Sequence, residues 1–306
     1  MSLFRSVAIG IASLLALPSA SVHARQAAST PQATFRARTD VVSVNVSVKQ
    51  GRRPVRNLTT SDFTLTDNGV EQSVNALALD RVPIDVTLVV TGNESASRDD
   101  RDAYYRALAS ASSVRRSLLP QDRLRLVSVH NDILGRLVGL EESLVLREMD
   151  LDRQLGVSVI DGLYYAIAWP VEPDRRHVVV AFTEGFDRFS VLDAEMFPRL
   201  IQHSDAVLHV VLRDSPAYSN GPLRTQWETT QRIVSDAAWG TGGTVRTATD
   251  VLQDLAAIID DYRTSYVLQY TPRGTPAPGW HELRVRLTRP GRFDIRARRG
   301  YEVRRD

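Results

Sequence analysis

Three oxygen-bearing side chains, spaced two residues apart, follow the apolar run Ile84–Val90: Thr91, Asn93 and Ser95. In an open α/β sheet, ligands bind just beyond the carboxyl ends of the strands. Hydroxyl and amide oxygens suit a hard cation, and the hydrogens of the same groups suit an anion. The spacing therefore predicts a small binding loop at the end of this strand.

The elements that would position this loop alternate between strands and helices from residue 83 to residue 262. Apolar strands are expected at Ile84–Val90, Leu124–Val129, Val178–Phe182 and Val207–Leu212, with an edge strand at Leu134–Val138. Helices are expected at Arg98–Leu119, Asp161–Trp169, Asp193–His203, Arg224–Trp239 and Asp250–Tyr262. This alternation predicts an α/β domain over residues 83–262, with a Rossmann-like, doubly wound and mostly parallel sheet.

The residues on either side of this domain have β patterns. Valines alternate with polar residues from Val42 to Val48, and Asn68-Gly69 favours a tight hairpin turn. Alternating strands return at Ser265–Thr271, Glu282–Leu287 and Phe293–Arg298. We expect residues 35–80 and 263–306 to form the two halves of a small β-sandwich, with the α/β domain inserted between them.

The first residues are typical of an export signal. Arg5 precedes the apolar run Val7–Leu17, which is too short to span a bilayer, and Val22-His23-Ala24 is an acceptable cleavage site. We therefore expect a signal peptide at residues 1–24, a flexible lead-in at residues 25–34 and a secreted or periplasmic protein. An uncleaved signal anchor is the alternative. No later stretch predicts a membrane span, and the chain has no cysteine for disulfides.

Several segments together resemble exported bacterial proteins with a von Willebrand factor A-related domain, a family abundant in acidobacteria. The resemblance is carried by the segment from Leu58 to Gln72, LTTSDFTLTDNGVEQ, the turn Leu119–Arg123, the loop Thr183-Glu184-Gly185 and the endings Tyr266–Tyr270 and Arg298–Tyr301. It covers nearly everything after the signal peptide. It implies a von Willebrand A-type domain whose loops recognise another protein.

Domains of this kind often hold Mg²⁺ through a D-x-S-x-S loop, a threonine on a second loop and an aspartate on a third, and a partner's acidic residue completes the shell. On this chain the resemblance places Thr91, Asn93 and Ser95 on the first loop, Asp161 on the second and Glu184 on the third. Only Ser95 matches. One interpretation is a remodelled divalent-cation site anchored by Asp161 and Glu184. The other, which we favour because octahedral Mg²⁺ tolerates misplaced ligands poorly, is a degenerate site whose loop side chains only stabilise the fold.

These patterns predict a non-enzymatic protein-interaction or adhesion module whose unknown protein ligand could bind through an acidic residue. Two alternatives stay open: a hydrolase assembled from Ser95, His130 and Asp161, and an inert structural protein of the cell envelope. The formal net charge is only +2, and the densest basic run, Arg296-Ala297-Arg298-Arg299, is expected on the solvated face of a last strand. Nucleic-acid binding is therefore not expected.

Overall fold

The computed structural model describes residues 41–77, 82–92, 98–129, 133–138, 157–172, 174–275 and 278–303. The predicted signal peptide, the lead-in and the first residues of the sandwich lie outside this part of the chain, so they stay predictions. The same holds for Asn93, Ser95 and His130. Within the described ranges, no helix has the length and apolar character needed to cross a membrane.

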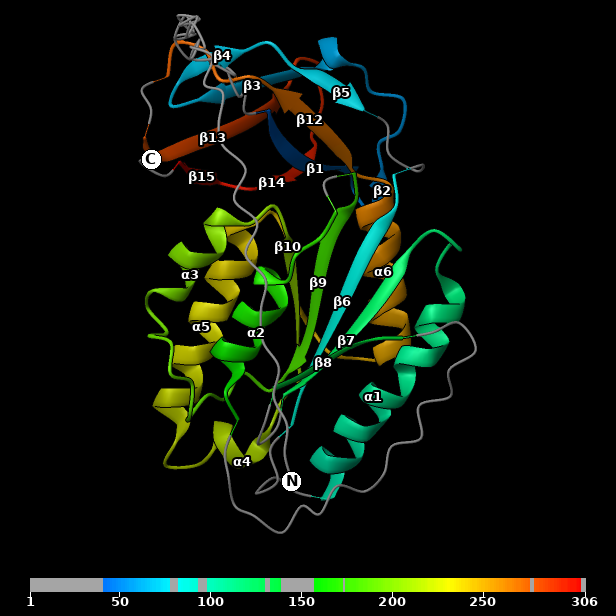
Figure 1. The fold of residues 1–306 in the computed structure, drawn as a ribbon, viewed down its shortest axis with the longest axis vertical. Coiled ribbons are helices and arrows are strands. Elements are labelled where there is room, and N and C mark those ends of the chain that lie inside the picture. Colours follow the sequence, from blue (N-terminus) through cyan, green and yellow to red (C-terminus); the bar gives the residue numbers. More distant parts are fainter. Residues whose placement is uncertain are drawn as a thin grey trace, which may run out of the picture. The chain divides into compact units, whose positions relative to one another are not determined.

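A six-stranded sheet forms the centre of the α/β domain (Figure 1). Its strands, in spatial order, are β11 (Val245–Thr247), β10 (Val207–Leu212), β9 (Arg176–Thr183), β6 (Ile84–Thr91), β7 (Arg123–Val129) and β8 (Ile133–Leu137). All neighbouring strands are parallel except β8, which pairs antiparallel with β7 at the edge. Both β6 and β9 are buried along their whole length, which explains why apolar residues predominate in their sequences.

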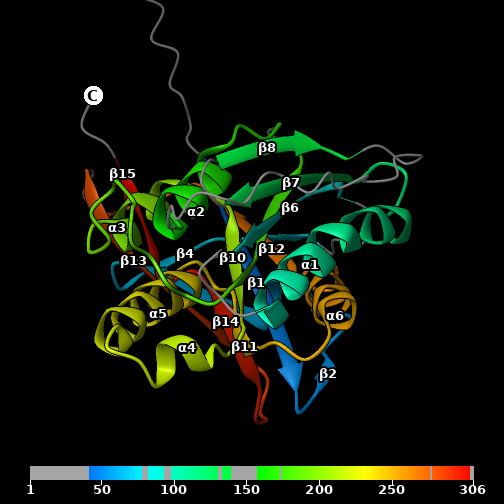
Figure 2. The ribbon, with the colours of Figure 1, turned by 90° about the horizontal axis from the view of Figure 1, so that it is seen from below.

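Helices cover both faces of this sheet, as the alternation of patterns predicts. They are α1 (Arg98–Ser117), α2 (Val159–Ala168), α3 (Phe197–Leu200), α4 (Pro216–Ser219), α5 (Arg224–Gly240) and α6 (Val251–Arg263). Apolar residues of α1 and α6 pack on one face, and those of α2, α3 and α5 pack on the other. Figure 2 shows α1 and α6 beside each other on their face. The doubly wound, mostly parallel α/β fold is therefore confirmed.

The expected helix at Asp193–His203 is wrong in extent. The structure has only the short α3 and a 3-10 turn, η2 (Ile201–His203). The Asp193 carboxylate accepts a hydrogen bond from the Glu195 amide at 2.9 Å, which favours a turn at these residues. Pro198 then stands near the start of α3, a position that its fixed φ angle suits.

Strands from both ends of the chain form the β-sandwich. One sheet has the order β14 (Asp294–Ala297), β1 (Val42–Gln50), β12 (Tyr266–Tyr270) and β5 (Asn75–Leu77), and β2 (Arg53–Pro54) pairs with β1. The other has the order β15 (Gly300–Val303), β13 (Gly279–Leu287), β3 (Phe63–Asp67) and β4 (Val70–Gln72), with the turn η1 (Thr60–Asp62) before β3. The sandwich made from N- and C-terminal strands is thus confirmed.

The local patterns of the sandwich have clear physical origins. Val44, Val46 and Val48 are buried while the residues between them are not, so the alternating sequence directs one face of β1 into the core. Asn68 and Gly69 have φ angles of 47° and 81°, which a two-residue hairpin turn requires. The residues after this turn divide between the two sheets, because β4 pairs with β3 whereas β5 pairs with β12.

A buried carboxylate ties four strands of the sandwich together: β3, β12, β13 and β15. Asp67 on β3 accepts hydrogen bonds from the hydroxyls of Tyr270 at 2.8 Å and Tyr301 at 2.9 Å, and His281 Nδ1 lies 2.8 Å from its second oxygen. Burial, together with the hydrogen bond and negative charge of Asp67, raises the pKa of Tyr301 to about 12, although the contact with Tyr270 opposes this shift. The Tyr301 hydroxyl therefore keeps its proton at ordinary pH.

The expectation that Arg296 and Arg298 lie on a solvated face is wrong. Arg296 forms an ion pair with Asp261 at the end of α6, and Lys49 binds the same carboxylate at 2.8 Å. Arg298 is buried and binds Asp205 at 2.7 Å. These side chains face the inserted domain rather than solvent, and their charges link the sandwich to it. A further strand, β15, follows them.

The Asp261 ion pairs predict a pH-dependent stability. Burial favours the neutral acid, but hydrogen bonds and charges from Lys49 and Arg296 outweigh it and hold the pKa of Asp261 below its ordinary value. The contribution of the Asp261 carboxylate to the free energy of unfolding is therefore complete above pH about 4, and it is lost as pH falls through the lowered pKa. At pH 6 we expect Asp261→Asn to lower the free energy of unfolding by about 3 kcal/mol.

Urea unfolding of wild type and Asp261→Asn at several pH values from 6 to 3 measures this effect, and the difference between the two proteins should shrink as pH falls. Glu228→Gln is the control, because the Arg224–Glu228 pair is exposed and should change stability by less than about 0.5 kcal/mol. A difference that is constant across this pH range would contradict the assignment.

Candidate functional site

The carboxyl ends of β6 and β9, where two of the predicted loops begin, lie beside each other. Thr91, the last residue of β6, donates its hydroxyl to the Thr183 hydroxyl at the end of β9, at 2.8 Å. Thr183 in turn accepts the Gly185 amide at 2.9 Å. Both hydroxyls are buried, so Thr91 fastens two strand ends together.

Glu184 follows directly and is also buried. Its carboxylate forms an ion pair with the guanidinium of Arg213, which comes just after β10. The Arg213 amide also donates to the Thr183 carbonyl at 2.9 Å, so the backbone of this residue is fixed against β9. A positive charge supplied by the chain itself therefore neutralises Glu184.

Asp161 takes part in a reciprocal set of hydrogen bonds between the start of α2 and the loop after β9. Its two carboxylate oxygens accept the amides of Val191 at 2.8 Å and Leu192 at 3.0 Å. In return, the amides of Ile160 and Asp161 donate to Asp187 and Ser190, at 2.8 Å and 3.1 Å. We call the side chains of Asp161, Asp187 and Ser190 the clasp.

The clasp solves a local problem of the helix. The first amides of a helix have no partner within it, and Ser158, the N-cap residue of α2, makes no capping hydrogen bond through its side chain. Asp187 and Ser190 supply the missing acceptors from a distant part of the chain, and their negative charge and dipoles suit the positive end of the helix.

These contacts do not fit a divalent-cation site. Glu184 is neutralised by Arg213, both oxygens of Asp161 accept backbone amides, and the Thr91 hydroxyl is bonded to Thr183. Among the residues that the structure describes, no group of three or more His, Asp or Glu side chains converges as metal ligands. Mg²⁺ needs about six oxygens in near-octahedral geometry, which these side chains do not offer together.

The loop after β9 is held rigidly but has an apolar tip. The side chains of Trp227 and Gln231 on α5 both donate to the Glu184 carbonyl, at 2.7 Å and 3.1 Å. The ring of Phe186 is buried and stacks on Tyr218 with the ring centroids 4.2 Å apart. Phe189 and Val191, on either side of the clasp residue Ser190, are 47% and 93% exposed.

The hydrolase alternative draws on residues outside the part of the chain that the structure describes. Ser95 and His130 lie outside the described residues, and the third member, Asp161, has both oxygens occupied by loop amides. Two other histidines, His177 and His209, are buried, and burial lowers their pKa values to about 4 and about 3. Both are therefore neutral. His177 lies near the start of β9 and His209 lies inside β10, so neither is at the carboxyl end of its strand.

Three structures similar to this chain match over more than half of it. An aerotolerance-related membrane protein from Bacteroides fragilis, with multiple mutations to serines, is 11% identical, with 58% of this chain and 98% of that chain covered and a TM-score of 0.42. The conserved hypothetical protein BatB from Bacteroides thetaiotaomicron is 10% identical, with 58% and 98% covered and a TM-score of 0.43. The SpRpn10 VWA domain is 14% identical, with 57% and 94% covered and a TM-score of 0.40.

No family model and no curated protein matches the sequence. At sequence identities this low, shared folds do not carry shared partners or activities. The function of this chain therefore has to be argued from its own residues.

Sequence reasoning did not find Arg213, Asp187 or Ser190. Arg213 is one arginine among many in the chain, and nothing in the sequence pairs it with Glu184. The pattern Asp187-x-x-Ser190 did carry a signal, because short side chains with oxygen acceptors at this spacing often bind nearby backbone amides. The amides that these side chains bind belong to α2. Ile160 lies 27 residues before its acceptor Asp187 in the sequence, which hides the pairing.

The clasp predicts a specific effect on loop dynamics. Asp161→Ala removes the acceptors of the Val191 and Leu192 amides, so hydrogen exchange at these two amides should become about tenfold faster or more. Exchange measured by NMR at each amide tests this. Asp193→Ala is the control, since among the described residues its carboxylate binds the Glu195 amide of the same loop and no amide of the clasp. Unchanged exchange at Val191 and Leu192 in Asp161→Ala would show that the clasp does not hold the loop.

Proposed function

We propose that this chain is an exported, non-enzymatic protein-interaction or adhesion module of the von Willebrand A type. It acts in the periplasm or outside the cell and recognises a protein partner at the carboxyl edge of its parallel sheet. The observation that carries the proposal is the loop between β9 and α3, which exposes Phe189 and Val191 while the clasp fixes its backbone.

A rigid loop with exposed apolar side chains favours binding for two reasons. The free energy falls when a partner removes solvent-exposed apolar groups from water. A loop that is already ordered also loses little conformational entropy on binding. Arg188, whose guanidinium lies 5.5 Å from the ring centre of Phe189, adds a positive charge beside the apolar tip. An acidic residue of the partner is the group that this charge would attract.

In this proposal the module works without a divalent cation. A metal at the edge of the sheet would supply positive charge for a partner's carboxylate, but here Arg213 already neutralises Glu184. The five positions Thr91, Asn93, Ser95, Asp161 and Glu184 then form a degenerate metal site. The side chains of Thr91, Asp161 and Glu184 instead stabilise the strand ends and loops of the module through hydrogen bonds and an ion pair.

Site-specific photocrosslinking tests the proposed surface. A photoreactive phenylalanine analogue at position 191 is exposed to the envelope and extracellular proteins of the organism that encodes the chain. The same analogue at Leu252 on α6, which is 43% exposed on the opposite face of the domain, is the matched control. We expect position 191 to give a discrete crosslinked partner, and Leu252 to give none.

Two further conditions sharpen this experiment. The crosslink should persist when EDTA is added, and an excess of the wild-type protein should compete with it whereas Val191→Asp should not. An inert structural protein would give no discrete crosslink, or the same pattern at both positions, and either result would overturn the proposal. Loss of the crosslink in EDTA would show that the site depends on a metal.

A further inference from the structure

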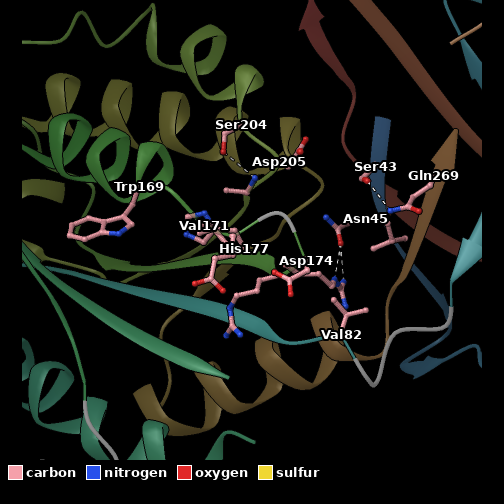
Figure 3. A pocket seen from close by; sticks show the side chains of 15 residues that line it. Ser43, Asn45, Val82, Trp169, Val171, Asp174, His177, Ser204, Asp205 and Gln269 are labelled. Carbon is pink, nitrogen blue, oxygen red and sulfur yellow. Dashed lines mark hydrogen bonds between the residues drawn. The ribbon is translucent and has the colours of Figure 1, made fainter. Parts of the chain in front are cut away.

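A cavity of about 380 Å³ lies at the opposite, amino end of the parallel sheet, between the sandwich and the α/β domain (Figure 3). The sandwich contributes the polar side chains of Ser43, Asn45 and Gln269. The α/β domain contributes Trp169 after α2 and the residues that lead into β9 and β10. Figure 3 shows these two groups of side chains on either side of the hollow. A volume of this size is typical of sites for small molecules.

Most of the charges around this cavity are paired inside the protein. Among its lining residues, Arg175 binds Asp85, Glu172 binds Arg123 at 2.8 Å, and Asp205 binds Arg298 at 2.7 Å. Two charged lining residues, Arg176 and Asp174, have no ion-pair partner within the described part of the chain. One buried positive charge and one exposed negative charge are therefore left for a ligand.

Arg176 is the buried member of this pair, with 6% of its surface exposed. Its guanidinium donates to Asn45 at 2.9 Å, to the Tyr262 carbonyl at 3.0 Å and to the Ser265 hydroxyl, and it stacks on the Tyr262 ring at 4.1 Å. All these partners are neutral, although the carbonyl at the end of α6 contributes a partial negative charge. The remaining nitrogen, Nη1, is buried and has no hydrogen-bond partner among the described residues.

A buried guanidinium without a carboxylate is costly, because burial disfavours its charged form and accordingly lowers the pKa of Arg176. An unused buried donor adds to this cost. A carboxylate in the cavity would relieve the first of these costs, because its negative charge would offset the positive charge of a guanidinium lining the same cavity. Arg176 thus marks the part of the cavity where an anionic oxygen is most stabilised.

The rest of the lining defines what else the ligand should carry. Asp174 is exposed and its carboxylate has no ion-pair partner among the described residues, which suits an ammonium group. Val82, Val171 and Val267 provide apolar surface beside the ring of Trp169. Gln269 donates to the Ser43 hydroxyl at 3.3 Å, so this polar wall has further acceptors for the hydrogens of a bound molecule.

We propose that this cavity binds a zwitterionic ligand of amino-acid size. Its carboxylate is directed to Arg176, its ammonium group to Asp174 and its side chain to the apolar surface around Val82 and Trp169. The site is independent of the proposed interaction surface, which lies at the other end of the strands.

Isothermal titration of the full-length protein tests this site with glycine, L-valine, L-leucine, L-glutamine and L-phenylalanine as probes. Two matched analogues of leucine separate its charges: 4-methylpentanoate lacks the ammonium group and 3-methylbutylamine lacks the carboxylate. We expect at least one amino acid with a side chain to bind. For leucine, the amine should bind about tenfold more weakly or worse, and 4-methylpentanoate about two- to fivefold more weakly.

Variants assign the binding to the cavity. Arg176→Gln should abolish binding, and Asp174→Asn should weaken amino-acid binding about two- to fivefold while leaving 4-methylpentanoate unchanged. Glu228→Gln removes an exposed charge far from the cavity and should bind as wild type does. Since Arg176 also links the two parts of the fold, Asp174→Asn decides the matter if Arg176→Gln does not fold.

Three results would overturn the inference. The first is that folded wild-type protein binds none of the five amino acids at about 10 mM, a concentration above the dissociation constants of functional small-molecule sites. The second is that 3-methylbutylamine binds as tightly as leucine, which would exclude a role for the carboxylate. The third is that Asp174→Asn binds amino acids as tightly as the wild type.

Discussion

The buried parallel pairing of β6 with β9 is the constraint on which the other features depend. Both strands are buried from end to end, so their middle residues pack against helices on two faces and are inaccessible to a ligand. Polar side chains of these strands can therefore reach a ligand only where the strands begin and end. At the carboxyl end this produces the Thr91–Thr183 contact and the Glu184–Arg213 pair, and at the amino end it produces the cavity beside Arg176.

The sequence predicts the architecture well because periodicity is a local property. The continuous apolar runs of β6 and β9, the alternating valines of β1 and the Asn68-Gly69 turn each need only their own neighbours to be interpreted. Contacts between distant residues are a different matter. Lys49 and Arg296 meet at Asp261, and Arg298 meets Asp205, although a run of arginines on a short strand is ordinarily solvated.

The candidate site illustrates the same limit. The sequence places Thr91, Asp161 and Glu184 at the ends of the correct elements, but it does not say which group neutralises each carboxylate. Arg213 follows a third strand, β10, and the Asp161 partners are backbone amides, which no residue pattern reveals. Charge balance in a fold depends on tertiary contacts, so a motif with altered residues cannot by itself distinguish a remodelled metal site from a rigid metal-free loop.

The central claim is that the carboxyl edge of the sheet is complete without a divalent cation. Paramagnetic Mn²⁺ tests it most directly, because it broadens the NMR signals of amides near any site that it occupies. Titrated into the folded protein, Mn²⁺ should cause no selective broadening at Gly92, Glu184 or Gly185, which lie where β6 and β9 end. Selective broadening at these amides that Mg²⁺ reverses and Asp161→Ala abolishes would contradict the account.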